Sequence, residues 1–202
     1  MSLRYALLAL LNVDAMTGYD LCKVFDSSVG HVWYAPDSQI YPQLRKMERE
    51  GLIDGEDVPW GKNATKRRYH ITEAGVADFT AWMNSPLEYA RVRDPAHLRA
   101  AYLEWASPAA VREQMRAHMA HHSFLLEAWR TRVHEIENGG SQMLNRRLER
   151  TAPQDRHRTI AFKRFAYEGL IARAEAEIAW AERGLRLADE LYGPEDSAPD
   201  GS

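Results

Sequence analysis

The chain has 202 residues, of which 45% are hydrophobic and 27% are charged, and its formal net charge is −3. This is the composition of a globular protein, so global disorder is excluded, and the length allows one large domain or two small ones. A sequence pI near 6.2 excludes recognition of nucleic acid through bulk charge. A nucleic-acid partner must therefore be met by a local patch.

The cysteine content and the N-terminal residues bear on the compartment. Cys22 is the single cysteine, so no intramolecular disulfide can form, and residues 1–11 hold no basic region or cleavage site of the kind found in signal peptides. No apolar run approaches the ~20 residues of a membrane span. We therefore expect a cytoplasmic protein that makes no membrane contact.

Helical periodicity dominates the start of the chain. The leucines from Leu3 to Leu11 recur at helical spacing and predict a short buried helix over Ser2 to Asn12. Thr17 followed by Asp20 has the form of a capping box, which predicts the start of a second helix.

A third helix is predicted to begin at Asp37 or Ser38. Its apolar residues Ile40, Leu44 and Met47 fall on one face at ~100° per residue, which identifies the buried side. The other face and its edges carry hydrogen-bonding and cationic groups, namely Ser38, Gln39, Tyr41, Pro42, Arg45, Lys46 and Arg49.

Two short strands, Leu52 to Val58 and Lys66 to Ile71, are predicted to follow, and Thr72 then starts a fourth helix. Three helices followed by a hairpin form a winged helix-turn-helix. The predicted wing carries four cations that can neutralise DNA backbone or enter the minor groove, namely Lys62, Lys66, Arg67 and Arg68.

The third helix has the chemistry needed to read DNA. A helix fits the major groove, where Arg pairs with guanine and Gln with adenine, so Gln39, Arg45 and Arg49 are candidates for base contacts. Ser38 and Tyr41 lie near the helix start and suit phosphates. The alternative is a solvated face on a winged-helix protein-interaction adaptor, because such folds serve both purposes.

The second half of the chain predicts long helices. Asp94-Pro95 and Ser107-Pro108 each start one, and a final helix follows a joint through Pro153. Two long amphipathic helices form a hairpin whose apolar stripes lack partners on one side, which predicts a homodimer. The stripe residues assigned to the dimer interface are Met115, Met119, His122, Leu126, Trp129, Ile178 and Leu185.

The fold class that follows is mainly α with a small β-wing. We expect a winged helix-turn-helix DNA-binding domain over residues 1–84 and a helical dimerisation domain over residues 94–192, which is also the candidate for effector sensing. Residues 193–202 are rich in Pro, Gly and Asp and are expected to form a disordered tail.

Four motifs in this order resemble the PadR family of bacterial transcriptional regulators: TGYDL at 17–21, SQIYPQL at 38–44, MEREGLI at 47–53 and RYHITEAG at 68–75. The resemblance extends from Leu3 to about Trp82. The helical half is similar to the dimerisation region of the family's larger members, which adds Trp180 to the expected interface. The resemblance implies a homodimer that represses, less often activates, from an inverted repeat in double-stranded DNA, with release by a small molecule in some members.

Sensing of phenolic acids is one role within that family. Lys163 stands where the stripe of the last helix calls for an apolar residue, with Phe162 and Tyr167 beside it and Tyr102 as a further candidate. A desolvated cation among rings suits an aromatic carboxylate. Alternatively, the lysine reaches water or a glutamate, or the dimer holds planar drugs as a multidrug-binding regulator. The family's ligand residues are not matched by any motif.

Other residues suggest no further chemistry. His118, His121 and His122 have the spacing of ligands on one helical turn, but no carboxylate or cysteine stands nearby in the sequence, so no metal is expected. Cys22 is interpreted as a buried structural thiol. Trp60 is either a cap over the hairpin or a groove-edge contact. No catalytic constellation or phosphate loop is present, so we expect neither an enzyme nor a cofactor.

Overall fold

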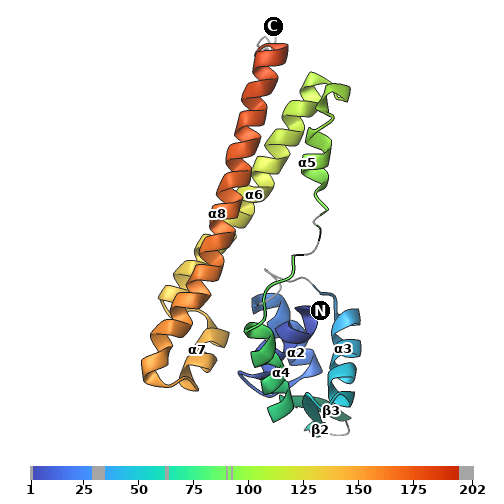
Figure 1. Ribbon diagram of the computed structural model, residues 1–202, viewed down its shortest axis with the longest axis vertical. Coiled ribbons are helices and arrows are strands. Elements are labelled where there is room, and N and C mark those ends of the chain that lie inside the picture. Colours follow the sequence, from blue (N-terminus) through green and yellow to red (C-terminus); the bar gives the residue numbers. More distant parts are fainter. Residues whose placement is uncertain (1, 29–34, 62–63, 90, 92, 196–202) are drawn as a thin grey trace. The chain divides into compact units, whose positions relative to one another are not determined.

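The computed structural model describes residues 2–28, 35–61, 64–89, 91 and 93–195. The chain divides into two compact units, which we name the winged unit (Met1–Tyr89 with Gln142–Ala152) and the helical unit (Ala90–Ser141 with Pro153–Ser202). Figure 1 shows the helices and strands of both.

The winged unit confirms the predicted fold class, with one addition. Its strands form an antiparallel sheet in the order β1-β3-β2. The first strand was not predicted, because two residues carry no periodicity and the strand exists only where Met16 pairs with Tyr69. Its elements are α1 (Ser2–Leu11), β1 (Met16–Thr17), α2 (Gly18–Ser28), α3 (Asp37–Arg49), β2 (Ile53–Trp60), β3 (Ala64–Ile71), α4 (Glu73–Met83) and α7 (Gln142–Glu149).

The core of the winged unit is built from large apolar side chains. Ile40, Leu44 and Met47 are the buried residues of α3, as the periodicity predicts. They pack with leucines of α1 and α2 and with Ile53 at the start of β2. Burial of such side chains stabilises the fold by roughly 1.5–3 kcal/mol each. The fully buried large residues are Phe25, Leu7, Leu8, Leu21, Ile40, Leu44, Met47 and Ile53.

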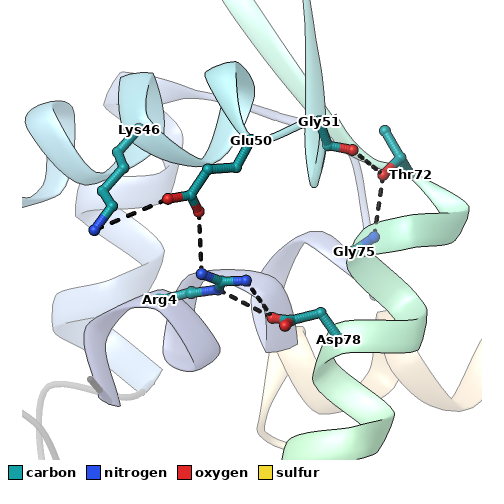
Figure 2. A network of polar contacts seen from close by, with 7 residues as sticks. All are labelled: Arg4, Lys46, Glu50, Gly51, Thr72, Gly75 and Asp78. Carbon is teal, nitrogen blue, oxygen red and sulfur yellow. Dashed lines mark hydrogen bonds and ion pairs between the residues drawn. The ribbon is translucent and has the colours of Figure 1, made fainter.

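A polar network at the end of α3 ties three helices together (Figure 2). The guanidinium of Arg4 on α1 donates to Glu50 at 3.0 Å and to Asp78 on α4 at 3.0 Å. Lys46 approaches the same Glu50 carboxylate at 3.9 Å. The network therefore fixes the C-terminal end of α3 against α1 and α4.

Thr72 and Gly75 explain the start of α4. The Thr72 hydroxyl accepts from the Gly75 backbone N–H at 3.1 Å and donates to the Gly51 carbonyl at 2.7 Å (Figure 2). A Cβ at Gly75 would stand 2.1 Å from the Leu52 carbonyl oxygen, which is backbone and cannot move aside. Glycine is needed here because α4 approaches the start of β2 so closely.

The helix α7 corrects the expectation of a simple joint before Pro153. Leu144 is buried in it, and Met143 packs against the core of the winged unit. Arg150 follows the helix and pairs with Asp14 at 2.9 Å. A segment far along the chain is thereby part of the winged unit, which falls within the range predicted as helical dimerisation domain.

The helical unit consists of α5 (Pro95–Ala100), η1 (Leu103–Trp105), α6 (Pro108–Glu137) and α8 (Pro153–Tyr192). The predicted helix starts are confirmed, because the Asp94 carboxylate accepts from the backbone of His97 at 3.0 Å and the Ser107 hydroxyl from Ala110 at 3.3 Å. The first of these helices ends at Ala100, and Trp105 in the 3-10 turn that follows is exposed.

The helices α6 and α8 lie side by side along the helical unit (Figure 1). On α8 the buried residues are Tyr167, Ala174, Ala181 and Ala188, which stand seven residues apart. Arg112 of α6 is buried and donates to Asp189 of α8 at 2.9 Å. The buried residues of α8 therefore follow a heptad repeat, and most of them are alanines, which lets the backbones of α6 and α8 come close together.

The predicted tail begins within the described residues. Glu195 forms an ion pair with Arg116 of α6, and residues 196–202 lie outside the described part of the chain. Among the helices that the structure describes, none combines the length and the apolar character that a membrane span requires.

Candidate nucleic-acid interface

The solvent face of α3 carries the residues predicted to contact DNA. Ser38, Gln39, Pro42, Arg45, Lys46 and Arg49 are all exposed, on the side opposite the buried stripe. Arg45 and Arg49 form no ion pair with any residue in the described part of the chain. Their guanidinium groups are therefore available to a partner, and their contact with DNA stays a prediction.

Tyr41 is held in place by a glycine of the preceding helix. A Cβ at Gly18 would stand 2.6 Å from the Tyr41 ring, so only glycine leaves room for it. Burial, with the neighbouring Cys22 and Asp37, raises the pKa of the Tyr41 hydroxyl. With 40% of its surface exposed, Tyr41 presents one edge to solvent and rests on α2 with the other. The glycine of the TGYDL motif thus positions a residue of α3.

Cys22 is a protonated thiol near neutral pH. Burial and a hydrogen bond with Asp37 raise its pKa to about 11. A redox-sensing cysteine needs a lowered pKa and an exposed thiolate, so the interpretation of Cys22 as a structural thiol fits its surroundings.

Arg67 on the wing is engaged by two carboxylates. It pairs with Glu48 of α3 and, at 3.2 Å, with Asp57 on the adjacent strand. The Glu48 hydrogen bond is the main reason that the Arg67 pKa is raised. Gly55 makes room for this pair, since a Cβ there would meet both Arg67 and Glu48. Arg67 thus links the wing to α3, and a phosphate contact would compete with these ion pairs.

Lys66 lies between two aromatic rings. Its Nζ is 3.0 Å from the centroid of the Trp60 ring and 4.6 Å from that of Tyr19. Trp60 thus makes a cation–π contact with Lys66 while 57% of its surface stays exposed, so a hairpin cap and a groove-edge contact both stay predictions. Arg68 is exposed and has no ion pair within the described residues, so its guanidinium is available to a phosphate, and that contact stays a prediction. Lys62 lies outside the described residues.

The residues predicted to bind an effector are only partly brought together. Lys163 Nζ is 5.4 Å from the centroid of the buried Tyr167 ring, and Phe162 is 69% exposed beside them. Tyr102, however, precedes the start of α6, whereas Tyr167 faces Arg132 near the end of that helix. The stretch of α6 from Pro108 to Arg132 is about 36 Å long at 1.5 Å per residue, so Tyr102 does not lie beside Lys163 within a single chain.

A different aromatic cleft was not foreseen from the sequence. It has a volume of about 470 Å³ beside α2 and the start of α3, and Tyr19, Lys23, Asp37 and Tyr41 are among its lining residues. These residues belong to two helices whose spacing in the chain gives no periodic signal, so only the tertiary fold reveals their proximity.

The predicted dimer residues fall into two groups. Met115 and Trp129 are already buried within one chain, and their part in a dimer interface stays a prediction. Met119, His122, Leu126, Ile178, Trp180 and Leu185 are half-buried. The exposed large apolar residues of these two helices are others, namely Phe124, Phe162, Phe165, Leu187, Leu191 and Tyr192.

Two family models match the chain. Residues 7–81 match the transcriptional regulator PadR-like family, and residues 92–188 match the virulence activator alpha C-term family. A curated relative, the negative transcriptional regulator PadR of Bacillus subtilis, is 36% identical over 81 residues, which are 40% of this chain and 44% of that protein. The matched part of the chain thus spans less than half the length of that relative.

Solved structures share the whole fold. Bacillus subtilis PadR in complex with operator DNA aligns with a TM-score of 0.74 and 22% identity, over 94% of this chain and 100% of that one. The same protein in complex with p-coumaric acid aligns with a TM-score of 0.71 and 23% identity, over 94% and 99%. At this identity the likeness establishes the fold.

Proposed function

Because the chain belongs to the PadR-like family of transcriptional regulators, with a C-terminal region of the virulence activator alpha type, we propose that it is a homodimeric repressor that binds an inverted-repeat operator. The family is one of DNA-binding regulators, which agrees with the prediction that the chain is not an enzyme. It also weighs against the alternative of a protein-interaction adaptor. Such a repressor would act on double-stranded DNA in the cytoplasm.

The observation that carries the proposal is the exposed face of α3. In a helix-turn-helix the second helix enters the major groove, and its side chains meet base edges. Here that helix presents Gln39, Arg45 and Arg49 to solvent, and the last two have no ion pair with a described residue. Guanine and adenine edges match these groups. We therefore assign base reading to α3 and phosphate contacts to Ser38, Tyr41 and Arg68.

The net charge favours DNA recognition that depends on where individual side chains lie and not on overall attraction. The chain is slightly acidic overall, and acids such as Glu48 and Asp57 neutralise Arg67 within the wing. Attraction at long range should be weak, so affinity must come from a small number of well-placed contacts. A dimer would hold two copies of α3 and double those contacts. The two copies would meet half-sites that lie about one turn of DNA apart in a two-fold symmetric site.

Dimerisation is supported by the apolar surface of the helical unit. Phe162 and Phe165 are 69% and 70% exposed, and Leu191 is 65% exposed. Large apolar side chains on the outer faces of long helices favour burial against a second copy. Phe165→Ser should raise the dimer dissociation constant at least tenfold, as measured by light scattering across a dilution series. A monomer at micromolar concentration for the unmodified chain would overturn the dimer.

DNA binding is tested with fluorescently labelled DNA from upstream of the gene. Affinity should fall steeply with salt, and Arg68→Ala should reduce the salt slope by about one unit without altering sequence preference. Arg67→Ala is the matched control, because Arg67 is already neutralised by carboxylates and its loss should leave the slope nearly unchanged. An association that does not respond to salt would contradict the proposal.

We further propose that a small aromatic carboxylate, such as a phenolic acid, releases the repressor. Bacillus subtilis PadR, a structural neighbour, has been solved with p-coumaric acid. In this chain Lys163, Tyr167 and Phe162 combine a cation with rings, which suits such a ligand.

Two lysine variants locate the effector. Lys163→Met should abolish the quenching of tryptophan fluorescence by phenolic acids, whereas Lys23→Met, in the cleft beside Tyr19 and Tyr41, should leave it unchanged. The reverse result would move the effector to that cleft. Equal quenching by neutral planar dyes would favour a multidrug-binding regulator instead.

A further inference from the structure

A cluster of three metal-ligating side chains lies between the two long helices of the helical unit. His118 and His122 stand four residues apart on α6, and Glu177 comes from the facing side of α8. One ligand atom from each lies within 4.8 Å of the other two. From the sequence a metal was rejected because no carboxylate stood near the histidines. The fold supplies that carboxylate from a position 59 residues away.

The spacing of the donor atoms suits a small transition-metal ion. His118 Nε2 and Glu177 Oε2 are 3.2 Å apart. Ligands bound to Zn²⁺ at about 2.0–2.2 Å in a tetrahedral arrangement stand roughly 3.3 Å from one another, so this pair already has the required separation. The His118 and His122 rings are 4.4 Å apart at their centroids, so a modest ring rotation would complete the set.

One ring nitrogen of the cluster lacks a hydrogen bond to the described residues. The Nδ1 atom of His122 is buried and has no hydrogen-bond partner among the residues that the structure describes. Leaving a buried polar atom unpaired is unfavourable, so such atoms call for an explanation. A metal ion bound through this nitrogen would supply the missing partner.

The surroundings hold the cluster in place. The rings of Trp180 on α8 and His118 form a T-shaped pair with their centroids 5.1 Å apart, and His97 stacks on Trp180 at 4.5 Å. His118 and Glu177 are both largely buried, with 15% and 17% of their side-chain surfaces exposed. Side chains that are already held by such packing lose little conformational entropy when they bind a metal ion.

We propose that His118, His122 and Glu177 form a binding site for a divalent transition-metal ion of the Zn²⁺ type, with the fourth position open to water or to a small ligand. Two histidines and one carboxylate are a common set for such ions. The ion would clamp α6 to α8, because its ligands come from both helices. Its binding would therefore stabilise the helical unit.

The test measures binding of Zn²⁺ to the full chain by calorimetry, with Co²⁺ absorption as a second probe of coordination. His122→Ala and Glu177→Gln should each weaken binding at least about tenfold and remove the rise in Tm that Zn²⁺ causes. The matched control is His121→Ala, which removes an exposed histidine next to the site and should keep full binding. Circular dichroism of the metal-free variants checks that each remains folded.

Three results would overturn the site. These are the absence of Zn²⁺ binding to the unmodified chain, equal loss in His121→Ala and His122→Ala, and full affinity in Glu177→Gln. The last result would mean that Glu177 serves only as an ion-pair partner of His118. The inference does not rest on the proposed operator binding, since the readouts involve no DNA.

Discussion

The two units of this protein bury their residues in different ways. The winged unit closes its core with large side chains such as Leu7, Phe25 and Ile40, each at most 2% exposed. On α8 of the helical unit, three of the four buried residues are alanines, while Phe165 lies 70% exposed on the same helix. The winged unit is therefore complete within one chain. The helical unit buries a narrow seam and leaves large apolar side chains exposed, which the proposed dimer would cover.

The largest loss of stability is expected at Gly75, where the backbone of Leu52 lies so close that no Cβ fits. Gly75→Ala should lower the free energy of unfolding of the winged unit by about 3 kcal/mol or more, because the new Cβ meets the Leu52 carbonyl. Chemical denaturation followed by circular dichroism measures this change.

The matched control is a glycine of the helical unit. Gly169 lies on α8 with nothing within 4 Å of an added Cβ. Gly169→Ala should therefore raise stability by up to about 1 kcal/mol, since alanine is the better helix former. If both glycine variants behaved alike, the contrast between the two units would be wrong.

The next largest effect concerns the small residues of the helical seam. Ala181 is fully buried between α6 and α8, so Ala181→Leu should overpack the seam and lower stability by about 2 kcal/mol. Ala176→Leu, on the exposed side of α8, should be nearly neutral. Thermal unfolding of both variants separates packing from helix propensity, and equal Tm values would contradict a close helix pair.

The smallest effect is that of a helix cap. The Thr17 hydroxyl donates to the Asp20 carboxylate at 2.7 Å and accepts from the Asp20 backbone at 3.2 Å. Thr17→Ala should lower stability by about 1 kcal/mol, whereas Thr17→Ser keeps the hydroxyl and should cost little. Urea unfolding resolves this difference. A serine variant as unstable as the alanine variant would show that the hydroxyl is not what matters.

Local signals predicted most of the helices correctly. Helix starts at Thr72, Asp94 and Ser107 were recognisable because a capping side chain bonds the backbone two or three residues later. The buried stripe of α3 was recognisable because helical periodicity is itself local. These features need no knowledge of the rest of the fold.

Features that depend on distant residues could not be predicted. The strand β1 exists through its pairing with β3, and α7 is fixed by contacts with the winged unit. The ion pairs of Arg67 and the approach of Glu177 to His118 likewise join separate elements. In each case tertiary packing determines the partner. From the sequence alone, Arg67 therefore looked like a free cation and the histidines like a group without a carboxylate.

The proposed base reading by α3 depends on exposed side chains such as Arg45, which forms no ion pair with any described residue. It is tested by measuring the affinity of the unmodified chain and of Arg45→Ala for the operator and for each single-base-pair variant of it. Arg45→Ala should lose about 1–3 kcal/mol of discrimination at one base pair of each half-site and keep it elsewhere. Arg183→Ala, exposed on α8, is the control and should bind like the unmodified chain. Uniform weakening by Arg45→Ala across all operator variants would contradict the assignment of base reading to α3.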